Sequence, residues 1–410
     1  MHTHLTRWAI AALLAGAASV SAAQHWAATW TAPPQPAWAD DFVLPLGMPR
    51  HLDNVTLRQA LRTSIGGDRL RLVVSNAYGE APLRIGAAHV GLDGSDAGMP
   101  VTFEGSKDVV VAAGATAVSD PVALRTAAGA RLVVDVYLPT PSRLAGFHWD
   151  AREQALLQRG DTTGRKDATA GEKLPTRAFL SAVLVESARR PVAVVALGDS
   201  ITDGNGSTPG ADRRWPDHLA RRLAARGVAV LNAGISGNRL LRAGMGESAL
   251  ARLDRDVLQQ PGVRAVIVLL GTNDIGWPGG PFAPHEALPS TADIAAGFRQ
   301  LVQQARLRGV RVIGATLPPF EDALQGTPLE GHHSPRKEAI RQAVNEWIRH
   351  AGAFDAVVDF DRLLRDPARP SRMRPDFDSG DHLHPGDAGY RAMADAIDLQ
   401  TLFESSRSIP

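Results

Sequence analysis

Apolar runs and helical periodicities alternate along the second half of the chain, from residue 190 to residue 402. The near-continuous apolar runs predict buried strands of a parallel sheet over 192–198, 228–234, 265–271, 311–317 and 356–361. Apolar residues at helical spacing predict helices over 215–226, 248–260, 291–308, 335–351 and 387–397. Ser334 is a typical N-cap for the helix over 335–351, which begins with a proline. This alternation predicts a doubly wound α/β domain over 190–402.

The first half of the chain, over 25–188, has the period-two alternation and the frequent turn residues of antiparallel strands. Strands are predicted over 68–79, 107–124, 129–139 and 178–187, and a glycine turn divides the second of these ranges into two strands. Short strands separated by turns are typical of sandwiches and jelly rolls. We therefore expect an antiparallel β-sandwich-like or jelly-roll-like domain ahead of the α/β domain.

Residues 1–23 combine a basic residue, an apolar run over 8–20 and a small-residue segment. This order is that of a secretory signal peptide, and it predicts a secreted or periplasmic protein that has no membrane contact after cleavage. A retained anchor is the alternative, although the run is shorter than the roughly 20 residues of a spanning helix. Because the chain has no cysteine, we expect neither disulfides nor a lipid-modified cysteine, and stability has to come from packing.

Charge is nearly balanced, with 44 Lys and Arg residues against 43 Asp and Glu residues. The basic cluster over 220–227 falls on a predicted helix, where we expect it to form a solvated face. Nothing in this composition indicates a nucleic acid or an anionic membrane as a partner.

Polar residues follow the predicted strands of the α/β domain where those strands end. In open α/β sheets, ligands bind at the carboxyl ends of the strands. Four segments stand at or near such ends: GDSITDG at 198–204, NAGISGN at 232–238, GTND at 271–274 and DHLHP at 381–385. We expect them to converge on one cleft.

The residue types in these segments fit together as one chemistry. A serine hydroxyl such as that of Ser200 is a poor nucleophile until a base takes its proton, and His384 can be that base. Asp381 can accept from the other ring nitrogen and fix the tautomer. The N–H groups of Ser200 and Gly237 and the amide of Asn273 are candidate donors to an oxyanion. Taken singly, each residue also has a structural interpretation, as a turn residue, a helix cap or a loop-bridging side chain.

Together, the four segments resemble the signature blocks of the SGNH, or GDSL-type, hydrolases over about residues 191–400. The segments 214–223, 345–349 and 379–397 resemble a bacterial subgroup of arylesterases and acylhydrolases, some associated with xylan degradation. The resemblance implies that Ser200 is the nucleophile, that Asp381 and His384 complete the triad, and that Ser200, Gly237 and Asn273 form the oxyanion hole. It also implies a flavodoxin-like strand order and neither a metal nor another cofactor.

Several neighbouring residues need an interpretation of their own. His382 is adjacent to His384 and could be mistaken for the base, although the family spacing favours His384. Asp199 and Asp274 lie beside candidate catalytic positions, and we expect them to tie loops by hydrogen bonds. Trp277 follows Asn273 closely and is a candidate for lining the acyl or sugar pocket, whereas Trp215 is expected to anchor the core.

A metal-dependent deacetylase is the alternative that the histidines raise. His332 and His333 are adjacent, and adjacent side chains point to opposite sides. Neither a cysteine nor a His-Glu-x-x-His frame accompanies them, so we expect no metal centre. We expect these two histidines to lie at the rim of the cleft or in a solvated loop.

The sequence thus predicts a secreted serine esterase that acts on short-chain carboxylic esters of a small molecule or a polysaccharide, such as acetyl groups on xylan. A lipase or lysophospholipase is the enzymatic alternative, and it would require a wide apolar patch around the cleft. A carbohydrate-binding protein with a degenerate hydrolase domain is the alternative from another class. The N-terminal domain is expected either to brace the cleft or to bind glycan.

Overall fold

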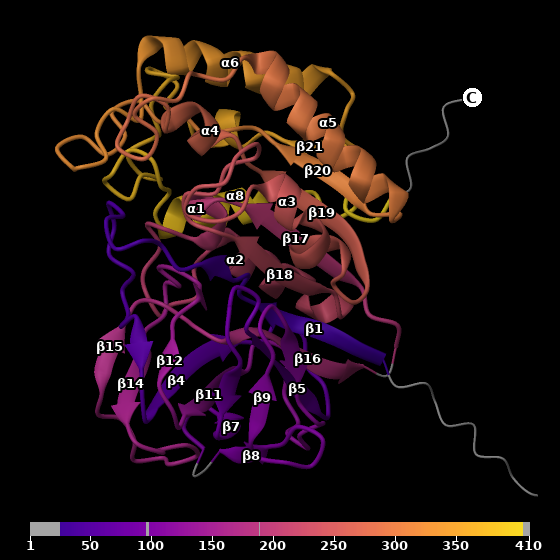
Figure 1. Ribbon diagram of the computed structural model, residues 1–410. Helices are drawn as coiled ribbons and strands as arrows, with labels where there is room; N and C mark the ends of the chain where they lie inside the picture. Colours follow the sequence, from indigo (N-terminus) through magenta and orange to yellow (C-terminus); the bar gives the residue numbers. More distant parts are fainter. Residues whose placement is uncertain (1–24, 96–97, 188, 405–410) are drawn as a thin grey trace, which may run out of the picture.

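The computed structural model describes residues 25–95, 98–187 and 189–404, and Figure 1 shows their arrangement. The predicted signal peptide at 1–23 lies outside the described residues. Within the described ranges, no helix combines the length and the apolar character needed to cross a bilayer.

Two antiparallel sheets form most of the N-terminal domain. The four-stranded sheet has the order β1 (His25–Thr31), β16 (Leu180–Ser187), β5 (Leu70–Ser75) and β10 (Thr116–Val118). The six-stranded sheet has the order β15 (Glu172–Leu174), β14 (Ala155–Arg159), β4 (Val55–Arg62), β11 (Arg131–Leu138), β7 (Ala87–Leu92) and β8 (Met99–Val101). In β11, alternate residues from Leu132 to Leu138 are fully buried, which is the pattern of a strand with one face in the core.

Three two-stranded ribbons complete this domain. They pair β12 (Ser142–Arg143) with β3 (His51–Leu52), β13 (Gly146–Phe147) with β2 (Gln35–Pro36), and β6 (Leu83–Ile85) with β9 (Val109–Val111). The residue that follows β13, His148, contacts the C-terminal domain.

A five-stranded parallel sheet forms the centre of the C-terminal domain. Its order is β18 (Ala229–Gly234), β17 (Ala193–Gly198), β19 (Val263–Leu269), β20 (Arg311–Ala315) and β21 (Ala356–Val358). In chain order this is 2-1-3-4-5, the flavodoxin-like order, and the predicted fold class is confirmed. Every residue of β17 is buried, because both faces of the sheet are covered by helices. The order reverses beside β17, so the loop after this strand lies where such folds bind ligands.

Helices cover both faces of the parallel sheet. They are α1 (Ser200–Asp203), α2 (Trp215–Leu223), α3 (Ala249–Leu253), α4 (Thr272–Gly276), α5 (Thr291–Leu307), α6 (Pro335–His350), α7 (Phe360–Leu364) and α8 (Asp387–Asp395). A 3₁₀ turn (Ala224–Arg226) extends α2, and a π-helical turn (Asp254–Leu258) extends α3. Right-handed crossovers place α2 on one face and α3, α5 and α6 on the other. Accordingly, α2 packs against α8, and α5 packs against α3 and α6.

The sequence predicts all five strands of the parallel sheet and its five longer helices but places some of their ends wrongly, and it misses the N-terminal strands β1, β4, β7 and β14. The strand predicted over 356–361 stops at Val358, because Asp359 accepts a hydrogen bond from the N–H of Arg362 and caps α7. The short helices α1 and α4 were not predicted, since four or five residues give no measurable periodicity. Trp215 is fully buried at the start of α2, as expected of a core anchor.

The two domains pack against each other along the edge strand β18. Figure 1 shows β1 and β16 lying next to the parallel sheet, and β1 contacts β18 directly. The hydroxyl of Thr31 donates to the carbonyl of Asn232 at 2.9 Å, and Arg62 pairs with Asp212 at 2.5 Å. The N-terminal domain is therefore joined to the element that carries the second predicted site segment.

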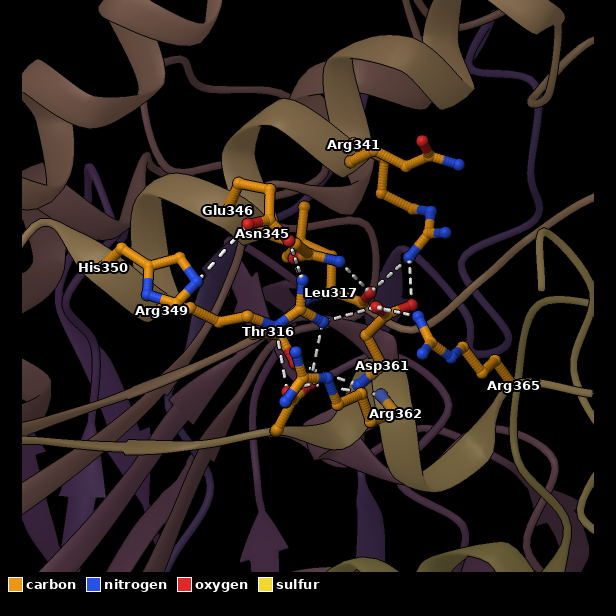
Figure 2. A network of polar contacts seen from close by, with 12 residues as sticks. Thr316, Leu317, Arg341, Asn345, Glu346, Arg349, His350, Asp361, Arg362 and Arg365 are labelled. Atoms are coloured by element: carbon orange, nitrogen blue, oxygen red, sulfur yellow. Dashed lines mark hydrogen bonds and ion pairs between the residues drawn. The ribbon is translucent and has the colours of Figure 1, made fainter. Parts of the chain in front are cut away.

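A buried ionic network fixes α6 to the ends of β20 and β21, and Figure 2 shows it from close by. The Arg341 guanidinium donates to both oxygens of Glu338, to Asp361 and to the carbonyl of Leu317. Arg349 donates to Asp361 and to the cap residue Asp359. The network thus ties one helix to the turn between β21 and α7.

Candidate active site

The loop after β17 places Ser200 at the beginning of a short helix. Asp199 is the N-cap of α1 and accepts the N–H of Ile201 at 3.0 Å. Gly198 ends the strand, and a Cβ there would lie 2.0 Å from the hydroxyl of Thr202, so the turn requires glycine. As the first residue of α1, Ser200 carries an N–H that has no intrahelical acceptor. The helix therefore leaves the amide of Ser200 without an acceptor of its own.

A chain of hydrogen bonds links Asp381, His384 and Ser200. The Nε2 atom of His384 lies 2.8 Å from the Ser200 hydroxyl oxygen, across a sequence separation of 184 residues. The Nδ1 atom of His384 lies 2.6 Å from one carboxylate oxygen of Asp381. Because an ionised carboxylate only accepts, the proton of the neutral ring belongs on Nδ1. Nε2 is then free to accept the Ser200 proton.

Asp381 stays ionised although it is partly buried. Burial opposes its charge, but the hydrogen bond and charge of His384 and the N–H groups of Leu383 and His384 outweigh it and lower the Asp381 pKa. All three donors come from the turn that begins at Asp381 itself. The spacing Asp-x-x-His therefore builds the acceptor and orients the imidazole within one local structure.

The loop after β18 contacts the start of α4. Gly237 has φ +72°, and a Cβ at this position would lie 2.2 Å from the sulfur of Met245. The Asn273 amide donates one N–H to the carbonyl of Asn238 at 3.0 Å, which holds it next to Gly237. An amide nitrogen has two N–H groups, so the second remains for a ligand. The predicted oxyanion donors are thus on neighbouring segments.

Asp274 and Asp199 have the loop-tying positions that the sequence predicts. Asp274 accepts the N–H groups of Leu240 and Leu241, at 2.7 and 2.9 Å, and so joins α4 to the loop after β18. Asp199 caps α1 with one oxygen, while its other oxygen is buried without a partner. Burial raises the Asp199 pKa to about 7.

Two other predicted residues lie apart from the hydrogen-bonded chain. His382 has φ +60° and its Nδ1 contacts Asp378, a different carboxylate from that of His384. Trp277 is 4% exposed and packs beneath the Gly237 turn, with its ring stacked on Phe282 at 4.5 Å. In this position it supports the turn, and direct contact with a substrate stays a prediction.

His332 is not in a solvated loop, contrary to expectation. It is buried and lies edge-on to Phe320, and it occupies the space that a Cβ on Gly276 would need. Burial lowers its pKa to about 3, so its ring is neutral. Across the described ranges, no group of three or more His, Asp or Glu side chains is arranged to hold a metal ion.

Sequence reasoning missed one residue that reaches this region, His148 of the N-terminal domain. Its Nε2 lies 3.0 Å from Asp203, the last residue of α1. The two residues are 55 positions apart and belong to different domains, so no local pattern connects them. In the sequence, the one feature that could have pointed to this contact is Asp203, the second acid of the GDSITDG segment.

Comparisons with known proteins bear on the C-terminal domain. Residues 196–392 match the model of the GDSL-like Lipase/Acylhydrolase family. No curated protein matches the chain in sequence.

Solved structures with similar domains include three bacterial proteins. An aryl esterase from M. smegmatis is 21% identical, covers 50% of this chain and 95% of its own, and has a TM-score of 0.39. A carbohydrate acetylesterase from Sinorhizobium meliloti is 20% identical, with coverages of 50% and 95% and a TM-score of 0.38. A GDSL-like lipase from Bacteroides thetaiotaomicron is 20% identical, with coverages of 52% and 91% and a TM-score of 0.39. The family match over residues 196–392 identifies the C-terminal domain as a GDSL-like lipase/acylhydrolase domain, which supports a carboxylic ester hydrolase.

Proposed function

We propose that this protein is a serine esterase that hydrolyses short-chain carboxylic esters through an acyl-enzyme. The observation that carries the proposal is the hydrogen-bonded chain from Asp381 through His384 to Ser200. Its order of acceptor, imidazole and hydroxyl is that of a nucleophile activated by an oriented base.

In the proposed mechanism, Nε2 of His384 takes the Ser200 proton as the hydroxyl oxygen bonds to the ester carbon. The carbonyl oxygen becomes an oxyanion, which the N–H groups of Ser200 and Gly237 and the Asn273 amide stabilise. When the intermediate collapses, the ester C–O bond breaks and His384 gives its proton to the leaving alcohol. Water then repeats both steps on the acyl-enzyme and releases the carboxylic acid.

The enclosure of the site supports small acyl groups. Ser200, Asn273 and His384 are 7%, 4% and 8% exposed. Behind the Gly237 turn, Met245 and Trp277 fill the space closely. A long acyl chain would need an apolar channel that this packing leaves little room for.

The nucleophile and base assignments are tested by matched substitutions. Ser200→Ala and His384→Asn should each lower the kcat for p-nitrophenyl acetate by at least about 10⁴-fold, because neither variant has an activated nucleophile. His382→Asn is the control, since asparagine tolerates φ +60° and His382 contacts only Asp378 among the acids of this loop. An active Ser200→Ala protein, or equal losses in the two histidine variants, would contradict the proposal.

Substrate length and origin are tested separately. We propose acetyl esters, including those on plant polysaccharides, so kcat/KM should fall from p-nitrophenyl acetate to the octanoate and the palmitate. A rise with chain length would favour a lipase instead. Acetate release from acetylated xylan, compared between the wild type and Ser200→Ala, tests the polysaccharide.

We also propose that the protein is exported, on the basis of residues 1–23 alone. Mass spectrometry of the protein recovered from the periplasm or medium should give an N-terminus near Ala23 or Gln24. A cytoplasmic protein that retains Met1 would contradict this.

A further inference from the structure

One histidine of the N-terminal domain is inserted between the domains close to Ser200. His148 follows β13 directly and is 7% exposed. Its Nδ1 lies 3.0 Å from the carbonyl oxygen of Pro33, and its Nε2 lies 3.0 Å from one carboxylate oxygen of Asp203. Each ring nitrogen therefore faces an oxygen, one of its own domain and one of the other domain. His148 is therefore held from its own domain and in turn holds a residue of the other.

Asp203 connects this histidine to the loop of the proposed oxyanion hole. It is 1% exposed, and its second oxygen accepts both the N–H and the hydroxyl of Ser236, at 3.1 and 2.8 Å. Ser236 is the residue immediately before Gly237. Asp203 also ends the helix that Ser200 begins. A single buried carboxylate thus fixes the nucleophile's helix relative to the Gly237 turn.

The end of β18 and the end of α1 are in such close contact that a small shift of one would displace the other. A Cβ on Gly234 would lie 2.3 Å from the backbone nitrogen of Asp203. Gly237 itself has φ +72°, a conformation that its neighbours have to hold in place. Because Ser236 is bonded through both its N–H and its hydroxyl, the residue just before the Gly237 N–H is anchored to Asp203 by its backbone and its side chain.

A second contact from the N-terminal domain acts on the other side of the same turn. The side chains of Gln35 and Trp38 both donate to the carbonyl of Met245, at 2.6 and 2.7 Å. The Met245 sulfur is the atom closest to where a Cβ on Gly237 would be. The Gly237 turn therefore lies between two sets of contacts that the N-terminal domain provides.

We propose that His148 is a positioning residue for the esterase reaction, so that the N-terminal domain is a working part of the active site. Through Asp203 and Ser236, it holds the N–H of Gly237 in the direction of the developing oxyanion. The inference rests on the proposed function, because the oxyanion exists only if Ser200 attacks an ester.

The test compares kcat and KM for p-nitrophenyl acetate in the full chain. His148→Ala should lower kcat by about tenfold to a hundredfold with KM within about twofold, since the oxyanion forms only in the transition state. His148→Gln, whose amide can still donate to Asp203, should recover most of the loss. Arg62→Gln is the control: it also removes an interdomain contact to a buried carboxylate, Asp212, but it does not touch the Ser236 loop, so kcat should be unchanged.

A double-mutant cycle identifies the route of the effect. Ser236→Ala removes one of the two bonds to Asp203 and should lower kcat severalfold. If His148 acts through Ser236, the kcat of the double variant His148→Ala/Ser236→Ala should lie within about twofold of that of His148→Ala alone. If the two residues act independently, the two losses in kcat should multiply. If His148→Ala fails to fold by circular dichroism, then His148→Gln and Ser236→Ala decide the question. Wild-type kcat in Ser236→Ala would then overturn the inference.

The outcomes separate this inference from the proposed function. A wild type that hydrolyses no ester, or that keeps its activity in Ser200→Ala, removes the proposed function. If Ser200→Ala is inactive while His148→Ala keeps the wild-type kcat, only the role of His148 is overturned. Equal losses in His148→Ala and Arg62→Gln would likewise overturn it, because they would indicate a general effect of weakening the interface.

Discussion

The ionic network of α6 contains two arginine–glutamate pairs, one buried and one exposed, whose contributions to stability can be compared. Arg341 is 1% exposed and makes four hydrogen bonds at 2.6–2.8 Å: two to Glu338, one to Asp361 and one to the carbonyl of Leu317. Arg349, in the same network, pairs with Glu346 at 2.8 Å, but the Glu346 side chain is 61% exposed. The two arginine–glutamate pairs have similar geometry and very different solvent access.

Arg341→Met should therefore destabilise the C-terminal domain far more than Glu346→Ala. Methionine leaves Glu338 without its main partner in a buried site, and breaking a buried pair costs about 3–5 kcal/mol. In Glu346→Ala, only the guanidinium nitrogen of Arg349 that was bonded to Glu346 becomes hydrated. An exposed ion pair of this kind contributes about 1 kcal/mol or less to the free energy of unfolding. Arg349 also keeps its bonds to Asp359 and Asp361, which Figure 2 shows in part.

Urea unfolding followed by circular dichroism at 222 nm measures this difference. In the described part of the chain, every α-helix lies between Ser200 and Asp395, so the helical signal reports the C-terminal domain alone. With a slope of about 2–3 kcal/mol per molar urea, Arg341→Met should lower the midpoint by roughly 1–2 M. Glu346→Ala should lower it by roughly 0.5 M or less. Equal shifts in both variants, or an Arg341→Met midpoint within 0.5 M of the wild type, would refute the reasoning from burial.

Three further predictions concern the site. Asn273→Ala should lower kcat by on the order of a hundredfold or more, and near-normal turnover would remove Asn273 from the oxyanion hole. Gly237→Ala should abolish turnover, because its Cβ meets Met245 and its φ is positive; an active variant would contradict the tight turn. Asp199 has a folded pKa of about 7, above its ordinary value, so it makes the fold less stable as pH rises from about 4 to about 7. Asp199→Asn should remove this dependence, and its stability advantage measured in urea should grow by about 2–3 kcal/mol from pH 5 to pH 8, whereas parallel pH profiles would disprove the shift.

The sequence was most informative where a local pattern determines the structure. Buried parallel strands such as 193–198 are apolar throughout, so their run and their polar ends are visible in the letters alone. The turn from Asp381 to His384 supplies its own donors, and its geometry follows from its spacing. Periodicity alone does not predict that Ser200 lies beside His384. That prediction depended on the order of the four segments and on their resemblance to a known family.

Contacts that depend on the packing of distant segments were not predictable in this way. His332 was expected at the rim of the cleft or in a solvated loop, and its burial against Gly276 and Phe320 excludes the solvated loop. The path of the long segment between β20 and α6 is set by its packing against other elements, which no local pattern reveals. Trp277 was a candidate pocket residue, and its burial under Gly237 depends on how α4 packs. His148 and Asp203 meet only because two domains with separate hydrophobic patterns dock along β18.

The pairing of β1 with β16 also sets the order in which a nascent chain can mature. His25 is paired with Ser187, so the opening strand leaves the ribosome without the neighbour that it needs. At roughly 5–20 residues per second, it waits on the order of ten seconds or more for its partner to be synthesised. During that interval it is an apolar edge that another chain can capture. Chaperone protection of the emerging polypeptide is thus most valuable before residue 187 has been synthesised.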